Sequence, residues 1–243
     1  MKTLISSRWH RIATVPLAVL LMGAGLLFSG PVLAQTIVGT AHDFSGQVGW
    51  TEQNGEICVV CHTPHNSYSE GEAGAGLGEL GPLWNRALTA VSTYDLYDST
   101  TRVGSFINAT MAAPTGVSKL CLSCHDGTIA IDSFGRDDNG APFVSSGAPD
   151  YVGDINANAN IGGGTPGGTN SDLSNDHPVS FVYADSVAGD TEIVAAAGGL
   201  PLFGGNLECA TCHDVHATEA VPDTKLLRVD NAGSGLCLTC HDK

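Results

Sequence analysis

The stretch Glu208-Cys209-Ala210-Thr211-Cys212-His213-Asp214-Val215-His216 contains the pattern that organises this chain. Two cysteines separated by two residues are followed at once by a histidine, and a second histidine follows three residues later. The Cys-x-x-Cys-His pattern occurs four times, at Cys58–His62, Cys121–His125, Cys209–His213 and Cys237–His241. The four copies use all eight cysteines of the 243-residue chain. Any interpretation of the cysteines therefore has to explain this spacing.

Cys-x-x-Cys-His is the attachment pattern of c-type haem, in which two thiols bind the vinyl groups of one haem and the histidine binds its iron. Zinc sites and disulfides are the alternatives for paired cysteines. Neither alternative explains why a histidine follows every pair in a chain with only nine histidines. We therefore expect four covalently bound haem c groups. Their thioether positions are Cys58, Cys61, Cys121, Cys124, Cys209, Cys212, Cys237 and Cys240, and their motif ligands are His62, His125, His213 and His241.

Four further histidines could supply the sixth ligand of each iron. They remain once the motif histidines and His10 are set aside, and they are His42, His65, His177 and His216. After the first 34 residues the chain has a single methionine, Met111, so at most one haem could have His/Met ligation. A histidine satisfied by hydrogen bonds is the simpler interpretation for any one of them. The match between four irons and four histidines favours bis-His ligation throughout.

The order of these histidines and motifs occurs twice. His42 precedes the first two motifs as His177 precedes the last two, and His65 and His216 each follow a motif histidine by three residues. This predicts an internal duplication of a dihaem unit, covering residues 35–135 and 177–243, with a Gly/Asn-rich insert or linker at 136–176. A histidine three residues beyond a motif histidine projects beside it, so it should reach a different haem.

We expect an irregular, loop-rich fold with short helices, in which the haems form the core. Ser118, Asn206 and Ser234 each precede a motif cysteine by three residues and are candidate N-caps. Gly127 is placed to end the second motif helix in the left-handed conformation.

Residues 83–97 are a candidate helix whose large side chains could cover haem faces, although core packing is the simpler role for them. Those side chains are Trp84, Leu88, Tyr94 and Tyr97. Asp154 begins an alternation of oxygen-bearing residues that resembles a calcium loop. Thr165 stands at its twelfth position where a bidentate Glu is needed, which favours a solvated Asx turn.

Residues 1–34 have the pattern of a signal peptide. Basic residues precede the apolar stretch Ile12–Phe28, and Val32-Leu33-Ala34 is typical of a cleavage site. An uncleaved anchor is the alternative. With 25 acidic and 10 basic residues, the chain is a poor partner for nucleic acid or anionic membranes. We expect a secreted protein, extracellular or at the cell surface, with the periplasm as the alternative and no membrane span after cleavage.

Several longer segments resemble the doubled-CXXCH multihaem c-type cytochromes, in particular the tetrahaem outer-surface cytochromes that polymerise into extracellular conducting filaments, or nanowires. These segments are Ile57–Asn66, Pro82–Arg86, Asp176–Phe181, Glu208–His216 and Asn231–His241. The resemblance implies a chain of haems in a loop-rich protomer, with one histidine donated to a haem of the neighbouring subunit. His65 is the first candidate for that inter-subunit ligand, and His42 the second.

The sequence therefore favours an electron conduit that passes electrons to redox partner proteins or extracellular acceptors. A soluble periplasmic electron carrier is the alternative, because periplasmic relatives share the haem motifs. A multihaem oxidoreductase is less favoured, since an enzyme would keep one haem five-coordinate or contain a Cys-x-x-Cys-Lys variant. We do not expect an enzyme.

Overall fold

The computed structural model describes residues 37–46, 55–65, 67, 83–89, 91–97, 113–135, 150–162, 171–216 and 225–242. The chain divides into the units Met1–Gln35 and Thr36–Lys243, and every described residue belongs to the second. The predicted signal peptide and Met111 lie outside the described residues. Where the structure is described, no helix has the length and apolar character needed to cross a membrane.

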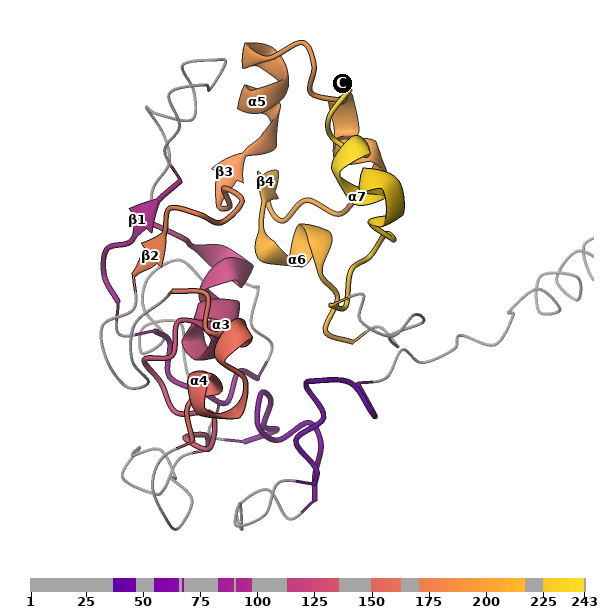
Figure 1. Ribbon diagram of the computed structural model, residues 1–243. Helices are drawn as coiled ribbons and strands as arrows, with labels where there is room; N and C mark the ends of the chain where they lie inside the picture. The colour runs from indigo at the N-terminus through magenta and orange to yellow at the C-terminus, as the bar shows by residue number, and fades with distance from the viewer. Residues whose placement is uncertain are drawn as a thin grey trace, which may run out of the picture. The chain divides into compact units, whose positions relative to one another are not determined.

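The described chain forms short helices and two-residue strands (Figure 1). The α-helices are α3 (Gly116–His125), α4 (Val152–Ile155), α5 (Tyr183–Gly189), α6 (Cys209–Cys212) and α7 (Gly235–Leu238). Three 3-10 helices, η3 (Ala157–Ala159), η4 (Ala195–Gly199) and η5 (Ala232–Ser234), lie between or beside them. Strand β1 (Asp95–Leu96) pairs in parallel with β2 (Asp172–Leu173), and β3 (Phe181–Val182) pairs antiparallel with β4 (Asn206–Leu207).

The longest of these helices, α3, contains the whole second motif. Thr115 precedes it in an extended conformation, and Asp126 follows its last residue. Gly127 then has φ of +71° and donates its N–H to the carbonyl of Cys124 at 2.9 Å. The predicted left-handed glycine is confirmed, because this conformation is costly for residues with a Cβ.

The predicted N-caps are correct at one position of three. Ser234 immediately precedes α7, although its side chain makes no capping hydrogen bond. Ser118 lies inside α3 and Asn206 lies in β4, so both of these predictions are wrong. The physical reason is that Thr115 and Glu208, and not Ser118 and Asn206, have the extended conformation that precedes a helix. The side chains of Ser118 and Asn206 make other hydrogen bonds.

The prediction of a helix over residues 83–97 is also wrong. The described part of this segment contains no helix, and it includes β1. Its backbone pairs with the first motif instead of with itself, since Asn85 N–H donates to the Cys61 carbonyl at 2.9 Å. The Thr89 hydroxyl accepts from the Val91 amide at 3.0 Å, a local bond that competes with helix formation. Trp84 and Leu88 pack against Leu120, as expected of core residues.

The segment predicted as an insert contains ordered elements. Helix α4, η3 and β2 all lie within its described part. Val152 packs with Val60, Ile131 and Phe134 in a cluster of buried residues. The Asn156 side chain accepts from the Asn158 amide at 3.1 Å, which is the Asx turn that the sequence favoured over a calcium loop.

Among the described residues, buried apolar side chains form three small clusters that lie against the motifs. Val60 is inside the first motif, and Leu120 directly precedes the second. Leu207 packs with Tyr183 and Ala197 in a third cluster, against which Cys240 also lies. The buried apolar side chains of the described residues therefore pack against the Cys-x-x-Cys-His segments or against residues next to them. A core made of haems and a division into two dihaem units stay predictions.

Candidate haem sites

Each motif is compact, with its histidine amide four residues beyond the carbonyl of its first cysteine. The motif histidine donates its N–H to the carbonyl of the first cysteine, at 2.8 Å for His62, 3.0 Å for His213 and 2.9 Å for His241. The second motif lies within α3 and has the same arrangement. Residues four apart in a helical turn share a face, so the first thiol and the imidazole of each motif lie on one side of it. This is the local geometry that attachment of a single haem requires.

No disulfide joins any two of the eight cysteines. Cys58 and Cys237 are exposed, and the other six are half-buried. Burial raises the pKa of the Cys61 thiol to about 11. Within the described residues, no group of three His, Cys, Asp or Glu side chains is placed to hold a metal ion. The structure thus contains neither a disulfide between these cysteines nor, among the described residues, a cluster of three metal-binding side chains.

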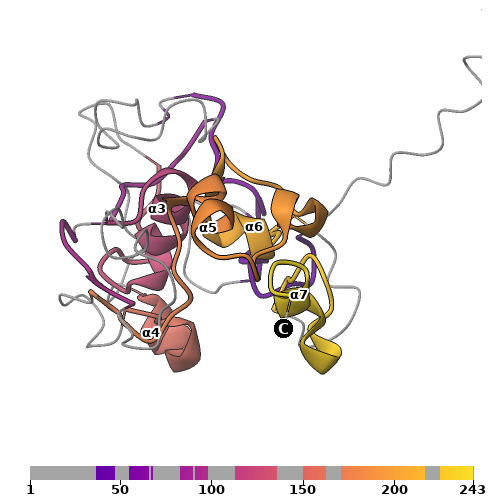
Figure 2. The ribbon, with the colours of Figure 1, turned by 90° about the horizontal axis from the view of Figure 1, so that it is seen from above.

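Thiols of the second and third motifs approach each other. A hydrogen bond to Cys209, together with burial, raises the pKa of Cys121. The helices that carry them are α3 and α6, which lie side by side in Figures 1 and 2. The Cys209 amide donates to the Ser118 hydroxyl at 3.0 Å, so the contact is also made through the backbone. Two attachment positions from opposite halves of the sequence thus meet.

Among the described residues, histidine rings lie close together in three pairs, one tilted, one stacked and one edge-on. His42 and His125 have ring centroids 5.9 Å apart, and His62 and His216 are 6.2 Å apart. His177 and His241 are 6.5 Å apart. Every pair joins one motif histidine with one histidine from outside the motifs.

This spacing fits an iron bound on both sides by imidazole. A metal–nitrogen bond of about 2 Å on each side puts the two ring centres roughly 6 Å apart. Haem supplies four nitrogen ligands itself, so two histidines complete an octahedral site. The residues present therefore fit haem better than they fit a metal ion that needs three or four protein ligands.

Backbone carbonyls orient several of these rings. Nδ1 of His125 lies 2.7 Å from the Ala159 carbonyl, and Nδ1 of His213 lies 2.8 Å from the Lys225 carbonyl. Nδ1 of His177 lies 2.8 Å from the Pro178 carbonyl. With the proton on Nδ1, the Nε2 atom of each ring has a lone pair for a metal.

His42 is held in its neutral form. Burial, together with the proximity of the imidazoles of His125, His213 and His216, lowers its pKa from 6.5 to about 4. Burial also lowers the pKa of His125. Only the neutral imidazole binds a metal, so both rings of this pair are in the ligating state at neutral pH.

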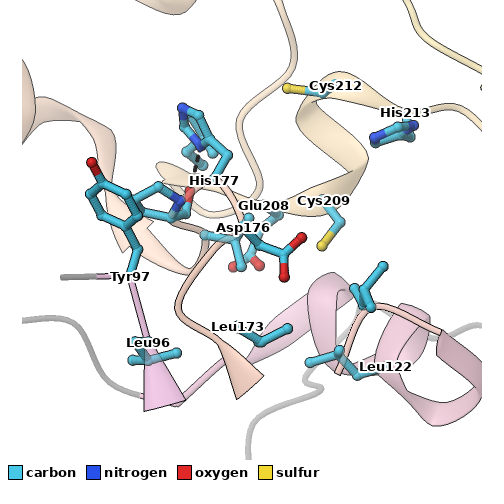
Figure 3. Close-up of a pocket in the computed structure, with 14 residues that line it drawn as sticks. Leu96, Tyr97, Leu122, Leu173, Asp176, His177, Glu208, Cys209, Cys212 and His213 are labelled. Atoms are coloured by element: carbon cyan, nitrogen blue, oxygen red, sulfur yellow. Dashed lines mark hydrogen bonds between the residues drawn. The ribbon is translucent and has the colours of Figure 1, made fainter. Parts of the chain in front are cut away.

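His65 and His213 differ from the other six. Both are exposed, and neither has a ring contact with a histidine in the part of the chain that the structure describes. His213 lines a cavity of about 230 Å³ together with Cys209, Cys212 and His177 (Figure 3). His177 thus borders the cavity of the third motif, while its ring faces His241.

Four described charged residues are buried and were not predicted from the sequence as site residues, namely Arg86, Asp126, Asp132 and Glu208. Glu208 lines the same cavity and is 1% exposed, and Asp126 directly follows His125 and is fully buried. In the sequence, Glu208 and Asp126 could have been identified by their positions directly beside the third and second motifs. Arg86 is also fully buried, and only its occurrence in a quoted segment of the resemblance pointed to it.

The comparison with protein families finds one match, which covers part of the chain. The family model described as "Doubled CXXCH motif" matches residues 201–243, which contain the third and fourth motifs. No curated protein and no solved structure shows significant similarity to the chain. The doubled motif implies covalently bound haem c, and hence an iron-binding, cytochrome c-like feature suited to electron transfer.

Proposed function

We propose that this protein is a tetrahaem c-type cytochrome that conducts electrons through a series of bis-His haems. One observation carries the proposal: each of the three histidine pairs joins one motif histidine with one outside histidine at the spacing of axial ligands. Structural histidines would have no reason to pair in this selective way.

Two of these pairs are equivalent under the internal duplication. His42 serves the iron of the second motif through its pairing with His125, and His177 serves the fourth through His241. Within their respective units these histidines stand at corresponding positions in the sequence. The agreement between the repeat and the ring contacts supports both assignments.

The third pair connects the two units. His216 belongs to the second half of the sequence and pairs with His62 of the first half. In the duplication, His65 corresponds to His216, and His213 corresponds to His62. The repeat therefore pairs His65 with the haem of the third motif, whose ligand is His213.

In a head-to-tail assembly, His65 of one copy could pair with His213 of the next copy. The two rings are not in contact within one chain, and both are exposed. In the proposed assembly, a neighbouring copy donates His65 to the haem that His213 binds. This contact between subunits would be equivalent to the pairing of His216 with His62 within one chain. Such a contact does not close on itself, so it builds a filament. We propose this filament as an extracellular electron conduit.

The chemistry divides between haem and protein. Haem supplies one-electron redox chemistry when bound. The chain contributes thiols, paired imidazoles and carbonyls that orient those imidazoles. Ligation of every iron by two histidines leaves no open position for a substrate, which is why we propose an electron conduit and not an enzyme. Its acidic surface would face redox partner proteins or extracellular acceptors.

Comparison of His65→Ala with His216→Ala tests the proposal in the full-length, haem-loaded protein. Mass spectrometry should give four haems for both variants and for the wild type. Each variant should contain one high-spin haem, but only His65→Ala should abolish filaments in electron micrographs while leaving an otherwise intact protomer. Fewer than four haems would contradict the tetrahaem assignment. A monomeric wild type with a high-spin haem in His65→Ala would indicate ligation within one chain and a soluble carrier.

A further inference from the structure

Arg86 is a buried cation whose hydrogen bonds are only partly satisfied. Its side chain is fully buried. Nη1 donates to the Ile131 carbonyl at 2.5 Å, and Nη2 donates to the Ala130 carbonyl at 2.7 Å. A guanidinium has five N–H donors, and the Nε donor has no hydrogen-bond partner. Two carbonyls do not neutralise the positive charge, and no described carboxylate forms an ion pair with it.

The described carboxylates do not supply that counter-charge by direct contact. The ion pair found among the described side chains is between Arg228 and Asp214, at 2.8 Å. Asp126 is occupied by the hydroxyls of Thr128 and Tyr94, at 2.7 and 2.9 Å, and by Thr89. Burying an unpaired charge costs several kcal/mol, so an anionic group is expected beside Arg86.

The position of Arg86 indicates where that anion comes from. The preceding residue attaches the segment to the first motif, because Asn85 N–H donates to the Cys61 carbonyl at 2.9 Å and its side-chain amide donates to the Val59 carbonyl at 2.5 Å. Trp84 packs its ring against His62 of the same motif.

Three consecutive residues in this segment contain a buried polar atom without a partner. These atoms are the indole Nε1 of Trp84, Oδ1 of Asn85 and Nε of Arg86. Such atoms are rare in native proteins, and three in succession indicate a polar group of another molecule at this place. Two of the three atoms are N–H donors, which suits a carboxylate.

We propose that Arg86 binds a propionate carboxylate of the haem attached at Cys58 and Cys61. This inference rests on the haem attachment proposed above and adds a specific anchor to it. The guanidinium offers Nε and a second Nη hydrogen to two carboxylate oxygens, the two-point arrangement that favours Arg over Lys. Its positive charge also stabilises the added electron on reduction, so it raises the reduction potential of that haem.

The test uses the full-length, haem-loaded protein with ¹³C at the propionate carboxyl carbons. In wild-type protein, redox-difference infrared spectra should show one ¹³C-carboxylate band displaced from the others. Arg86→Gln should remove that displacement and lower the equilibrium constant for reduction of one haem about tenfold, or about 59 mV for a one-electron couple. Arg86→Lys should keep most of the potential but lose part of the band displacement. Arg228→Gln removes an arginine that Asp214 already pairs, so it should leave the displaced band unchanged.

Outcomes against this proposal are distinct from those against the proposed function. A wild-type protein without four haems by mass would contradict the tetrahaem cytochrome itself. Four haems with identical carboxylate bands in wild-type, Arg86→Gln and Arg86→Lys proteins would overturn the propionate anchor alone. If Arg86→Gln does not fold, an Arg86→Lys spectrum that matches the wild type in both band position and potential would overturn it as well.

Discussion

Ser118 and Glu208 are hydrogen-bonded in the protein interior, and this contact joins the helices that carry the second and third motifs. Ser180 donates to the same Glu208 oxygen at 2.8 Å, and the Ser118 hydroxyl accepts from the Cys209 amide at 3.0 Å. All three side chains are buried. Buried polar contacts therefore connect the two attachment helices.

Ser118→Ala should destabilise the haem-loaded protein by about 1–3 kcal/mol, because it leaves the Cys209 amide without its acceptor and Glu208 without one of its donors. Chemical denaturation followed by circular dichroism measures this change. Ser174→Ala is the matched control, since Ser174 is exposed and donates at 2.6 Å to the surface residue Asp172. Equal stability of the two variants would argue against a structural role for the Ser118–Glu208 contact.

Glu208 should make stability fall as pH rises. Burial raises its pKa above the ordinary value of 4.5, although hydrogen bonds from Ser118 and Ser180 oppose the effect. A raised pKa means that the folded state binds the proton more tightly, so this stabilisation is complete below about pH 4.5 and is lost as pH rises through the higher folded-state pKa. Glu208→Gln should flatten that part of the stability profile. Glu192→Gln, at an exposed position, should retain the wild-type slope.

Gly198 and Gly199 provide a matched pair for the fourth motif. Both have positive φ, of +59° and +90°. A Cβ on Gly198 would lie 2.4 Å from the backbone oxygen of Thr239, between the two motif cysteines, whereas a Cβ on Gly199 would meet nothing within 4 Å. Gly198→Ala should therefore displace the Cys237–Cys240 turn and reduce the haem count by mass from four to three. Gly199→Ala should keep four haems. Identical haem counts would show that the turn tolerates the added atom.

His42→Ala should convert the haem of the second motif from low spin to high spin, since His42 is the ring that faces His125. Electron paramagnetic resonance of the oxidised protein measures this conversion, and the remaining haems should keep their signals. His42→Met should restore a low-spin haem with a higher potential, because Met/His ligation raises the potential relative to bis-His. An unchanged spectrum in His42→Ala would exclude His42 as an axial ligand.

The local structure of the motifs could be predicted from the sequence, because it depends on residues close together. The turn from first cysteine to histidine, the glycine at position 127 and the residue before α7 are all decided within a few residues. The segment 83–97 was misjudged because its backbone bonds lie far away in the sequence, at Cys61 and Ser171. Periodicity of apolar residues contains no information about such partners.

The residues inside the site were harder to foresee for the same reason. His62 pairs with His216 across the two halves of the chain, a contact that no local spacing specifies. Arg86 and Glu208 would ordinarily be assigned to the surface, because charged residues are seldom fully buried. They are buried here by hydrogen bonds to carbonyls of residues 130 and 131 and to two serines.

The small size of the apolar clusters affects the stability of the polypeptide before haem attachment, and hence its abundance in the cell. Their separate packing offers little driving force for an unmodified polypeptide to stay compact, since short apolar contacts must outweigh the entropy of a long chain. Copies that miss their prosthetic groups would stay open to proteases. Under the proposed function, protein abundance would then follow the supply of porphyrin and iron.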